Sequence, residues 1–296
     1  MNKKVLIIGA SGLVGYSLYE HFSKDYEVIG TYNTHPFNNL IHLNLLNRKN
    51  LGKILKKSNP DIILLPAALS AVDYCEKNKD ECWNHNVNGP DNLIRLIRKS
   101  TKKLVYYSTD FIFDGENGPY IEEDVPNPLN NYGKAKFETE LNIRTNLLNW
   151  LIIRTTVVYG WEHQGKNFIY RLIKTLREGS TIKVPKDQVG TPTLVDNLAE
   201  ATKKLVDANK TGIYNVVGSE LMDRYMFALT AAGVFDLNKS LIEAVTTSEL
   251  NQLASRPLNG GLLINKLIKD IKIKMLAPKE GLEYLKRSKK DYALID

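Results

Sequence analysis

The chain has 296 residues, of which 43% are hydrophobic and 25% are charged. These proportions are typical of a globular protein, and they exclude a disordered or collagen-like chain. No apolar run approaches the roughly 18 residues that a membrane-spanning helix needs, and the first apolar run is closed by Gly9 instead of a signal-peptide cleavage pattern. We therefore expect a cytoplasmic protein that does not bind a membrane.

The 40 basic and 33 acidic residues leave a formal net charge of +7. Such a charge attracts nucleic acids, membrane surfaces or anionic small molecules. The basic residues lack the aromatic interleaving of a nucleic-acid platform, so we predict no nucleic-acid partner. Cys75 and Cys82 fall in one predicted helix and are interpreted as two reduced thiols, and no metal site is expected.

Short apolar runs alternate with amphipathic segments through the first half of the chain. The series starts with a strand at residues 5–8 and a helix through Tyr16 and Phe22. It ends with a helix that begins near Asn131 and a strand at residues 150–154. Continuous apolar strands separated by helices predict a parallel sheet covered on both faces, so the expected fold class is α/β, a Rossmann-type doubly wound sheet. Further strands are predicted at residues 26–29, 61–65 and 104–107.

A glycine-rich turn joins the first strand to the first helix. It reads Gly9-Ala10-Ser11-Gly12-Leu13-Val14-Gly15, which has G-x-x-G-x-x-G spacing. Glycines here permit a tight turn and let backbone N–H groups approach a pyrophosphate at the helix N-terminus, where the helix dipole favours negative charge. Glycine triplets also occur in surface turns, but the order strand, turn, helix predicts a dinucleotide site.

The end of the second strand indicates which dinucleotide is bound. An acid there would accept hydrogen bonds from the ribose hydroxyls of NAD, whereas this chain has Thr31-Tyr32-Asn33. The missing acid removes repulsion against a 2′-phosphate, to which Thr31, Asn33 and His35 could donate, although no arginine stands in the same loop. We therefore favour NADP(H) over NAD(H) as the cofactor. Taken alone, His35 is interpreted as an exposed loop histidine.

Tyr132 and Lys136 are four residues apart and would project from one face of a helix. An adjacent ammonium lowers the pKa of a tyrosine, and the hydroxyl can then act as a general acid in carbonyl reduction. By itself such a pair is common on helix surfaces. A third residue, Thr109 in Ser108-Thr109-Asp110, follows an apolar strand at the sheet edge where doubly wound folds bind ligands, and it can hydrogen-bond a substrate oxygen.

With these features the chain resembles, along nearly its whole length, the dTDP-4-dehydrorhamnose reductase family of the extended short-chain dehydrogenases/reductases. The most specific stretches are residues 108–115 and Tyr132-Gly133-Lys134-Ala135-Lys136. Similar segments occur at residues 71–73, 154–160, 188–193 and 256–259.

This resemblance implies NAD(P)H-dependent reduction of the 4-keto group of a nucleotide-linked deoxysugar. Tyr132 would be the proton donor, Lys136 would hold the nicotinamide ribose, and Thr109 would orient the carbonyl. Cofactor contacts would fall on Tyr132, Lys136, Gly9, Gly12, Leu13, Val14, Gly15, Asn44, Leu45, Ala67 and Ala68, and Ser11 and Thr31 complete the predicted cofactor site. The sugar nucleotide would contact Thr109, Asp110, Tyr132, Val157 and Arg256.

The chain departs from the family pattern at three places. Val157 stands where the family usually has tryptophan, so a flat stacking surface beside the sugar is lost. Residues 65–70 replace an Asn-Ala-Ala-Ala-Tyr-Thr type segment, and Asn44 replaces the usual acid near the adenine. The cofactor pocket is therefore expected to be reshaped, while the three catalytic residues are retained.

Beyond about residue 155 the loops lengthen and the chain becomes helix-rich, which predicts a smaller substrate-binding region interleaved with the first domain. Residues 212–217 are strand-like and are expected to return to the first sheet. The predicted division assigns residues 1–155 to an NAD(P)-binding domain, with residues 189–217 returning to it. Residues 156–188 and 218–296 form the substrate-binding region.

Two other functions stay open. A sugar-nucleotide epimerase or dehydratase would keep its NAD bound and return the hydride, and a regulatory subunit would bind the dinucleotide without turnover, as in the related beta subunit of methionine adenosyltransferase. The resemblance makes a homodimer plausible by analogy. The acidic run Glu122-Glu123-Asp124 lacks the glycine-punctuated loop of a calcium site and is interpreted as solvated loop charge.

Overall fold

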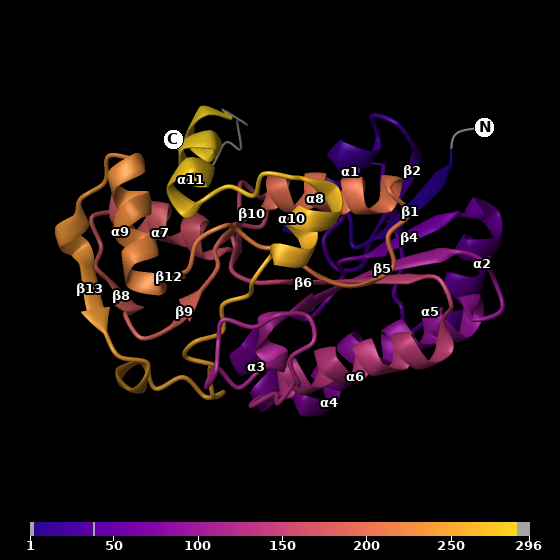
Figure 1. Cartoon of the computed structure of the whole chain (residues 1–296), viewed down its shortest axis with the longest axis horizontal. Coiled ribbons are helices and arrows are strands. Elements are labelled where there is room, and N and C mark those ends of the chain that lie inside the picture. Colours follow the sequence, from indigo (N-terminus) through magenta and orange to yellow (C-terminus); the bar gives the residue numbers. More distant parts are fainter. Residues whose placement is uncertain (1–2, 38, 289–296) are drawn as a thin grey trace.

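In the computed structural model, which describes residues 3–37 and 39–288, seven parallel strands form the central sheet (Figure 1). Their order is β11-β6-β5-β4-β1-β2-β3, so the chain changes the direction in which it adds strands between β1 and β4. This is the switch point of a doubly wound sheet, and it confirms the predicted Rossmann-type α/β class. The strands are β1 Lys4–Ile8, β2 Glu27–Tyr32, β3 Ile41–His42, β4 Ile62–Leu65, β5 Lys103–Thr109, β6 Trp150–Thr155 and β11 Gly212–Asn215.

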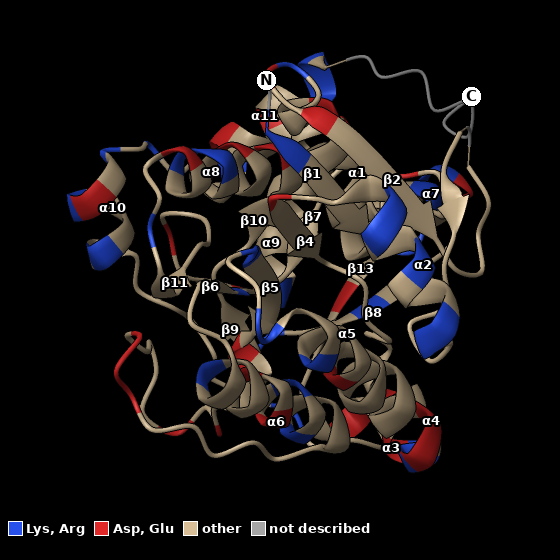
Figure 2. Ribbon diagram, turned by 90° about the vertical axis from the view of Figure 1, so that its right-hand side faces the viewer, with Lys and Arg blue, Asp and Glu red and all other residues tan. Residues whose placement is uncertain are grey.

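Helices cover both faces of the sheet, and alternate residues of each strand pack against one face or the other. In β1, Val5 and Ile7 belong to one core and Leu6 and Ile8 to the other, and all four are buried. Figure 2 shows α1 and α8 on one side of the sheet and α5 and α6 on the other. The first face is covered by α1 Leu13–Phe22, α8 Val195–Asp207 and α10 Asn265–Ile271, and the second by α2 Arg48–Ser58, α5 Gly89–Ile97 and α6 Asn131–Asn146.

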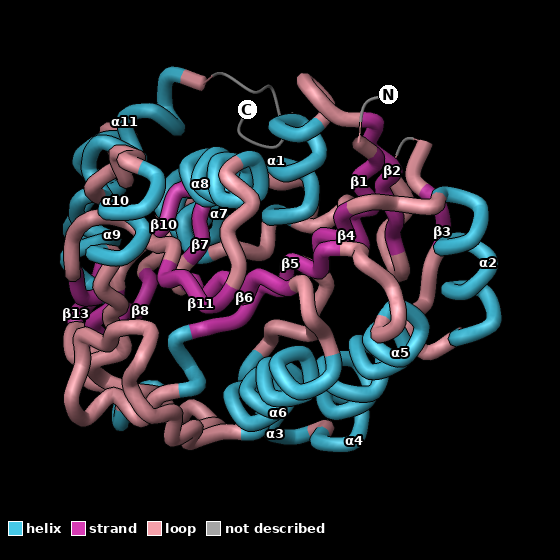
Figure 3. Tube along the Cα trace, turned by 45° about the vertical axis from the view of Figure 1, so that its right-hand side comes forward, coloured by secondary structure: helices cyan, strands magenta, loops and turns pink. Residues whose placement is uncertain are grey.

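A smaller region stands beside the end of the sheet that carries β11 (Figure 3). It has its own apolar core, to which Ile173, Phe227 and Leu282 contribute from three helices. Its elements are α7 Phe168–Arg177, α9 Arg224–Val234 and α11 Pro278–Arg287, with the parallel pair β8 Ile182–Pro185 and β13 Ile242–Val245. Two further short pairs lie between the regions, namely β7 Val158–Tyr159 with β10 Thr193–Leu194, and β9 Val189–Gly190 with β12 Met222–Asp223.

The late part of the chain returns to the main sheet, as the strand-like residues 212–217 predicted. β11 pairs with β6, and Tyr214 lies opposite Ile153. Leu267, Ile273 and Met275, much later in the chain, also pack in the core beneath α1 and α8. The two regions therefore share side chains along their border, and the division into two domains is kept as a prediction.

Two local predictions were wrong. Cys75 and Cys82 lie not in one helix but in two short ones, α3 Val72–Lys77 and α4 Lys79–Trp83, because Asn78 leaves helical geometry at φ −120° and ψ 65°. Both thiols are buried, and they do not form a disulfide. Glu122 is not solvated: it is 7% exposed, its carboxylate accepts a hydrogen bond from the backbone N–H of Asn215 at 2.9 Å, and burial raises its pKa.

Within the described residues, no helix is both long and apolar enough to cross a membrane.

Candidate functional site

The predicted site residues gather along the carboxyl edge of the sheet. This edge is where open α/β sheets bind ligands, beside the switch point of the strand order. The glycine turn follows β1, Ala67 and Ala68 follow β4, Thr109 ends β5, and Val157 follows β6. Thr31 lies near the end of β2. Residues that are far apart in the sequence are thus brought to one side of the molecule.

The glycine turn is shaped to hold a phosphate group. Gly9 has φ +97°, a left-handed conformation that glycine adopts without steric cost. At Gly15 an added Cβ would lie 2.0 Å from the carbonyl oxygen of Gly9, so only glycine lets α1 approach the turn this closely. No side chain caps the first N–H groups of α1, and its first turn carries no acid. These N–H groups can therefore bind an anion, and the turn fits the pyrophosphate of a dinucleotide.

Thr31 supports the turn from behind. Its side chain is fully buried, and its hydroxyl lies 3.3 Å from both the backbone nitrogen of Gly9 and the carbonyl oxygen of Ile7. The backbone N–H of Ala10 donates to the carbonyl of Thr31 at 2.7 Å. Thr31 therefore ties the end of β2 to the glycine turn, and its hydroxyl is already engaged by the backbone.

The other predicted adenosine-side residues line the neighbouring loops. Ala67 donates its N–H to the carbonyl of Ile8 at 3.1 Å and sits against Gly9. Ala68 is exposed. The side chain of Asn44 accepts a hydrogen bond from the N–H of Leu46 at 2.9 Å, and Leu45 packs beside the second core. These contacts shape the loops beside the glycine turn.

Thr109 and Tyr132 lie at the carboxyl end of β5, one of the central strands of the sheet. The Thr109 hydroxyl donates to Asp110 Oδ1 at 3.1 Å and accepts from the N–H of Phe111 at 3.2 Å. Burial and the negative charge of Asp110 raise the pKa of Tyr132, and the nearby Thr109 hydroxyl opposes them. The phenol therefore holds its proton at neutral pH, as a proton donor must before the reaction.

Lys136 lies one helical turn after Tyr132 and points into the protein. Its ammonium donates to the carbonyl of Tyr107 at 2.5 Å and lies 4.1 Å from the centre of the Tyr106 ring. Burial lowers the pKa of Lys136 to about 7, although the carboxylate of Glu140 raises it. The expected lowering of the tyrosine pKa by Lys136 is not found, because burial and Asp110 set the pKa of Tyr132.

The N-terminus of α6 is fastened on two sides, which fixes the direction of Tyr132. The side chain of Asn130 accepts from the N–H of Gly133 at 2.8 Å and donates to the carbonyl of Ser255 at 2.8 Å. The carboxylate of Glu76 accepts from the backbone and side chain of Asn131 at 3.0 and 2.7 Å. An acid at this helix end is also favoured by the helix dipole.

Three further predicted substrate residues are Asp110, Arg256 and Val157. The carboxylate of Asp110 is 4% exposed, and burial raises its pKa to about 6 although the hydroxyls of Thr156 and Thr109 donate to it. Arg256 forms an ion pair with Asp73, Nη2 to Oδ2, at 2.8 Å. Val157 has φ +46°, a conformation that a β-branched residue rarely adopts.

Two arginines that the sequence did not single out belong to this place. Arg224 begins α9, and burial lowers its pKa; the positive charges of Arg171 and Arg256 add to this effect, and the negative charge of Asp110 opposes it. Two further guanidinium groups thus act on Arg224, which itself lies near the buried carboxylate of Asp110. No motif surrounds Arg171 or Arg224, so only the fold, which packs α7 against α9, identifies them.

The parallel order of the sheet, the glycine turn and the edge residues define a dinucleotide-binding protein of the extended short-chain dehydrogenase/reductase type. Residues 3–289 match the family described as RmlD substrate binding domain, and the chain belongs to this family, that of the dTDP-4-dehydrorhamnose reductases.

Three proteins are similar to this chain over most of its length. The crystal structure of dTDP-4-dehydrorhamnose reductase from Bacillus anthracis str. Ames in complex with NADP has a TM-score of 0.90 and 28% identity, and the match covers 97% of this chain and 100% of that one. Spore coat polysaccharide biosynthesis protein SpsK of Bacillus subtilis is 32% identical, with 95% and 96% of the two chains covered. Methionine adenosyltransferase 2 subunit beta of Bos taurus is 30% identical, with 90% and 82% covered.

Proposed function

We propose that this chain is an NAD(P)H-dependent oxidoreductase that reduces the 4-keto group of a nucleotide-linked deoxysugar, with NADP(H) as the favoured cofactor. The observation that carries the proposal is the convergence of Thr109, Tyr132 and Lys136 at the sheet edge next to a glycine turn that fits a pyrophosphate. A likeness to a reductase crystallised with NADP supports it.

A bound nicotinamide dinucleotide would supply a hydride to the carbonyl carbon. The chain's own residues would bind the carbonyl oxygen and protonate it. The Thr109 hydroxyl would donate a hydrogen bond to the carbonyl oxygen, and Tyr132 would transfer its phenolic proton to the alkoxide that forms. The raised pKa of Tyr132 keeps the phenol protonated until hydride arrives, so that the proton is available for the alkoxide. Lys136, once charged, would stabilise the phenolate that the transfer leaves behind.

The arginines would hold the substrate's phosphates. A nucleotide sugar carries two phosphate charges, and one guanidinium group can bind two phosphate oxygens at once. Arg171 and Arg256 both act on Arg224 electrostatically, so an anion beside Arg224 would be stabilised. We include Arg256 and Asp110 in the substrate site as predicted, and we add Arg224.

The regulatory function remains a second candidate, because one relative at 30% identity is the beta subunit of a methionine adenosyltransferase. Val157, in place of the family's usual tryptophan, also favours a changed substrate pocket. In this case the chain would bind NADP(H) and a protein partner. A cytoplasmic location and a homodimer stay predictions for both candidates.

The test is turnover with purified protein, NADPH or NADH, and an enzymatically generated dTDP-4-keto-6-deoxy-L-sugar, followed by loss of reduced-cofactor absorbance. Tyr132→Phe should lose turnover and keep cofactor binding. Tyr26→Phe is the matched control. Tyr26 precedes β2, at the amino ends of the strands and so away from the site, and its hydroxyl donates a hydrogen bond to Asp207. Full activity in Tyr132→Phe would refute the mechanism.

Two further readouts separate the alternatives. Release of oxidised cofactor in proportion to product indicates a reductase, whereas an epimerase or dehydratase returns the hydride and releases none. Tight NADP(H) binding without oxidation across a panel of keto sugars, together with copurification of a catalytic partner, would favour the regulatory function.

A further inference from the structure

A segment from the second region reaches across to the glycine turn. Residues 161–167, here called the strap, join β7 to α7. The side chain of Gln164 donates to the carbonyl of Ser11 at 3.1 Å. The buried carboxylate of Glu162 accepts from the N–H of Lys166 at 2.7 Å and from the side chain of Asn167 at 2.8 Å. The strap is therefore folded on itself by Glu162 and attached to the turn by Gln164.

Aromatic packing joins the strap to the loop after β2. The ring of His163 lies 4.4 Å from the ring of Phe37 and 5.5 Å from that of Tyr16, centre to centre, and the Tyr16 and Phe37 rings are 5.4 Å apart. Phe37 belongs to the loop after β2 and Tyr16 to α1, so the strap contacts both walls of the adenosine side of the site. Burial lowers the pKa of His163, and the negative charge of Glu20, in α1, opposes this shift.

The end of the strap places a cation beside the loop histidine. The ammonium of Lys166 lies 3.2 Å from Nε2 of His35, and both side chains are exposed. Among the described residues, no carboxylate lies within 4.0 Å of this ammonium. Residues 31–37 contain no acid either. Two nitrogen groups are thus held together at the end of β2 without an anion from the protein.

The position of this pair determines its ligand. In doubly wound folds the residues after the second strand meet the 2′ position of the adenosine ribose, and a cation there accepts a 2′-phosphate. The loop after β2 has no arginine or lysine from Thr31 to Phe37. We propose that Lys166, supplied by the strap, and His35 form the binding site for the 2′-phosphate of NADP(H), so that a residue 131 positions away provides the charge missing from the loop. This inference rests on the proposed cofactor.

The test measures equilibrium binding of NADPH and NADH to the full-length protein, without any sugar substrate. A charge-assisted hydrogen bond is worth roughly 10- to 100-fold in affinity. Lys166→Gln should therefore weaken NADPH binding by roughly this factor and leave NADH within twofold. Lys166→Arg should retain the preference for NADPH, because a guanidinium also binds phosphate. His35→Gln should weaken NADPH in the same selective way.

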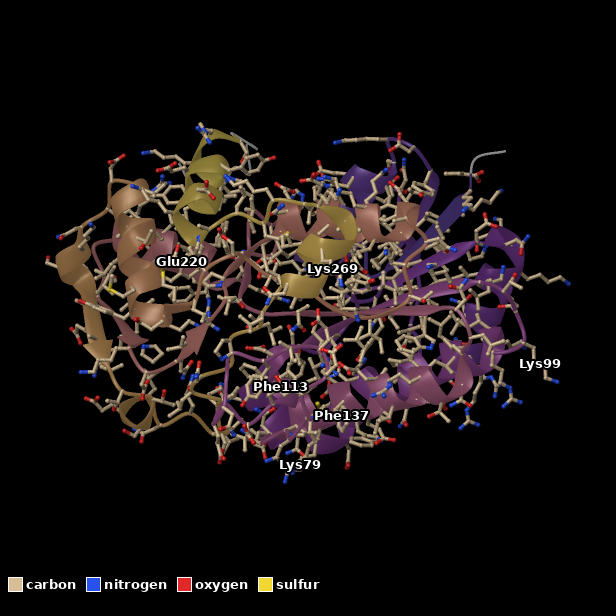
Figure 4. All side chains as sticks on the ribbon, in the orientation of Figure 1. Lys79, Lys99, Phe113, Phe137, Glu220 and Lys269 are labelled. Carbon is tan, nitrogen blue, oxygen red and sulfur yellow. The ribbon has the colours of Figure 1, made fainter. Side chains whose placement is uncertain are left out.

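Lys99→Gln is the matched control. Lys99, labelled in Figure 4, is exposed and lies in the loop before β5, at the amino ends of the strands and so away from the carboxyl ends where the site lies. It should change neither affinity. Equal weakening of NADPH and NADH by Lys166→Gln would show that the lysine only supports the strap, and would overturn the proposal. Unchanged NADPH binding would overturn it too. Because no keto sugar is used, a failed turnover assay and a failed binding prediction are separate results.

Discussion

The guanidinium of Arg154 and the carboxylate of Glu140 face each other inside the protein, with Nη2 and Oε2 2.8 Å apart and with 1% and 0% of the side chains exposed. A second bond joins Nε to Oε1 at 3.2 Å, and Nη1 donates to the carbonyl of Glu122 at 3.0 Å. The guanidinium also lies over the ring of Phe113, which is labelled in Figure 4. The pair fastens α6, which carries Tyr132 and Lys136, to β6.

Removing one partner of this pair should be costly, because it leaves a buried charge without compensation. We expect Glu140→Gln to lower the free energy of unfolding by about 3–5 kcal/mol, measured by urea denaturation. It should also lower the pKa of Lys136 further, since Glu140 raises it. The double variant Glu140→Gln/Arg154→Met removes both charges and should recover part of the loss. A single variant that costs less than about 1 kcal/mol would contradict this account.

Asp110 should make stability depend on pH. Its pKa rises from 3.8 to about 6 on folding, so the folded state binds more protons than the unfolded state between these values. Stability should therefore fall as pH rises from 4 to 6, by at most roughly 3 kcal/mol. Asp110→Asn should lack this dependence and be more stable than the parent at pH 7, with the difference vanishing near pH 4. Parallel unfolding curves at all pH values would refute it.

Gly15 and Gly52 offer a matched pair of glycine-to-alanine changes in helices. A methyl group at Gly15 would overlap the backbone of Gly9, so Gly15→Ala should displace α1, lower stability by roughly 1–3 kcal/mol and abolish dinucleotide binding. At Gly52, within α2, nothing lies within 4 Å of an added Cβ. Gly52→Ala should therefore raise stability by about 0.5–1 kcal/mol and leave binding unchanged. Retained binding in Gly15→Ala would be inconsistent with the phosphate turn.

Val157 and Val158 should respond differently to glycine. Both are half-buried, but only Val157 has a left-handed backbone, at φ +46°. Val158→Gly should cost about 2–3 kcal/mol through lost packing and backbone entropy. Val157→Gly should cost at least about 1 kcal/mol less, because glycine relieves the strain of a β-branched residue in this conformation. Chemical denaturation of the two variants decides this, and equal losses would exclude the strain.

The sequence predicted what depends on local patterns. Apolar runs of four or five residues located β1, β4, β5 and β6, because strands buried on both faces are continuously apolar. The glycine turn was predictable because its spacing has a direct steric cause. By contrast, β3 has only two residues, both exposed, and carries no such pattern. The helix break at Asn78 was missed because a single asparagine is compatible with a helix.

Contacts between distant segments account for what the sequence could not predict at the site. Thr31 reads as a donor to the cofactor, but the fold buries its hydroxyl against the glycine turn. The pKa of Tyr132 was expected to fall because Lys136 is near in sequence, yet burial and Asp110, 22 positions away, raise it. Arg224 and Lys166 reach the site only through the packing of the second region on the first. Spacing along the chain does not encode these distances.

The pairing of β11 with β6 also has a consequence for synthesis of the protein. While the chain emerges from the ribosome, β6 is complete at residue 155, but its partner strand begins only at residue 212. The nascent sheet therefore carries an open edge for more than 50 residues of elongation, roughly 3–10 s at ordinary translation rates. During this interval the unpaired backbone groups of β6 are a target for chaperones, or for aggregation with another chain.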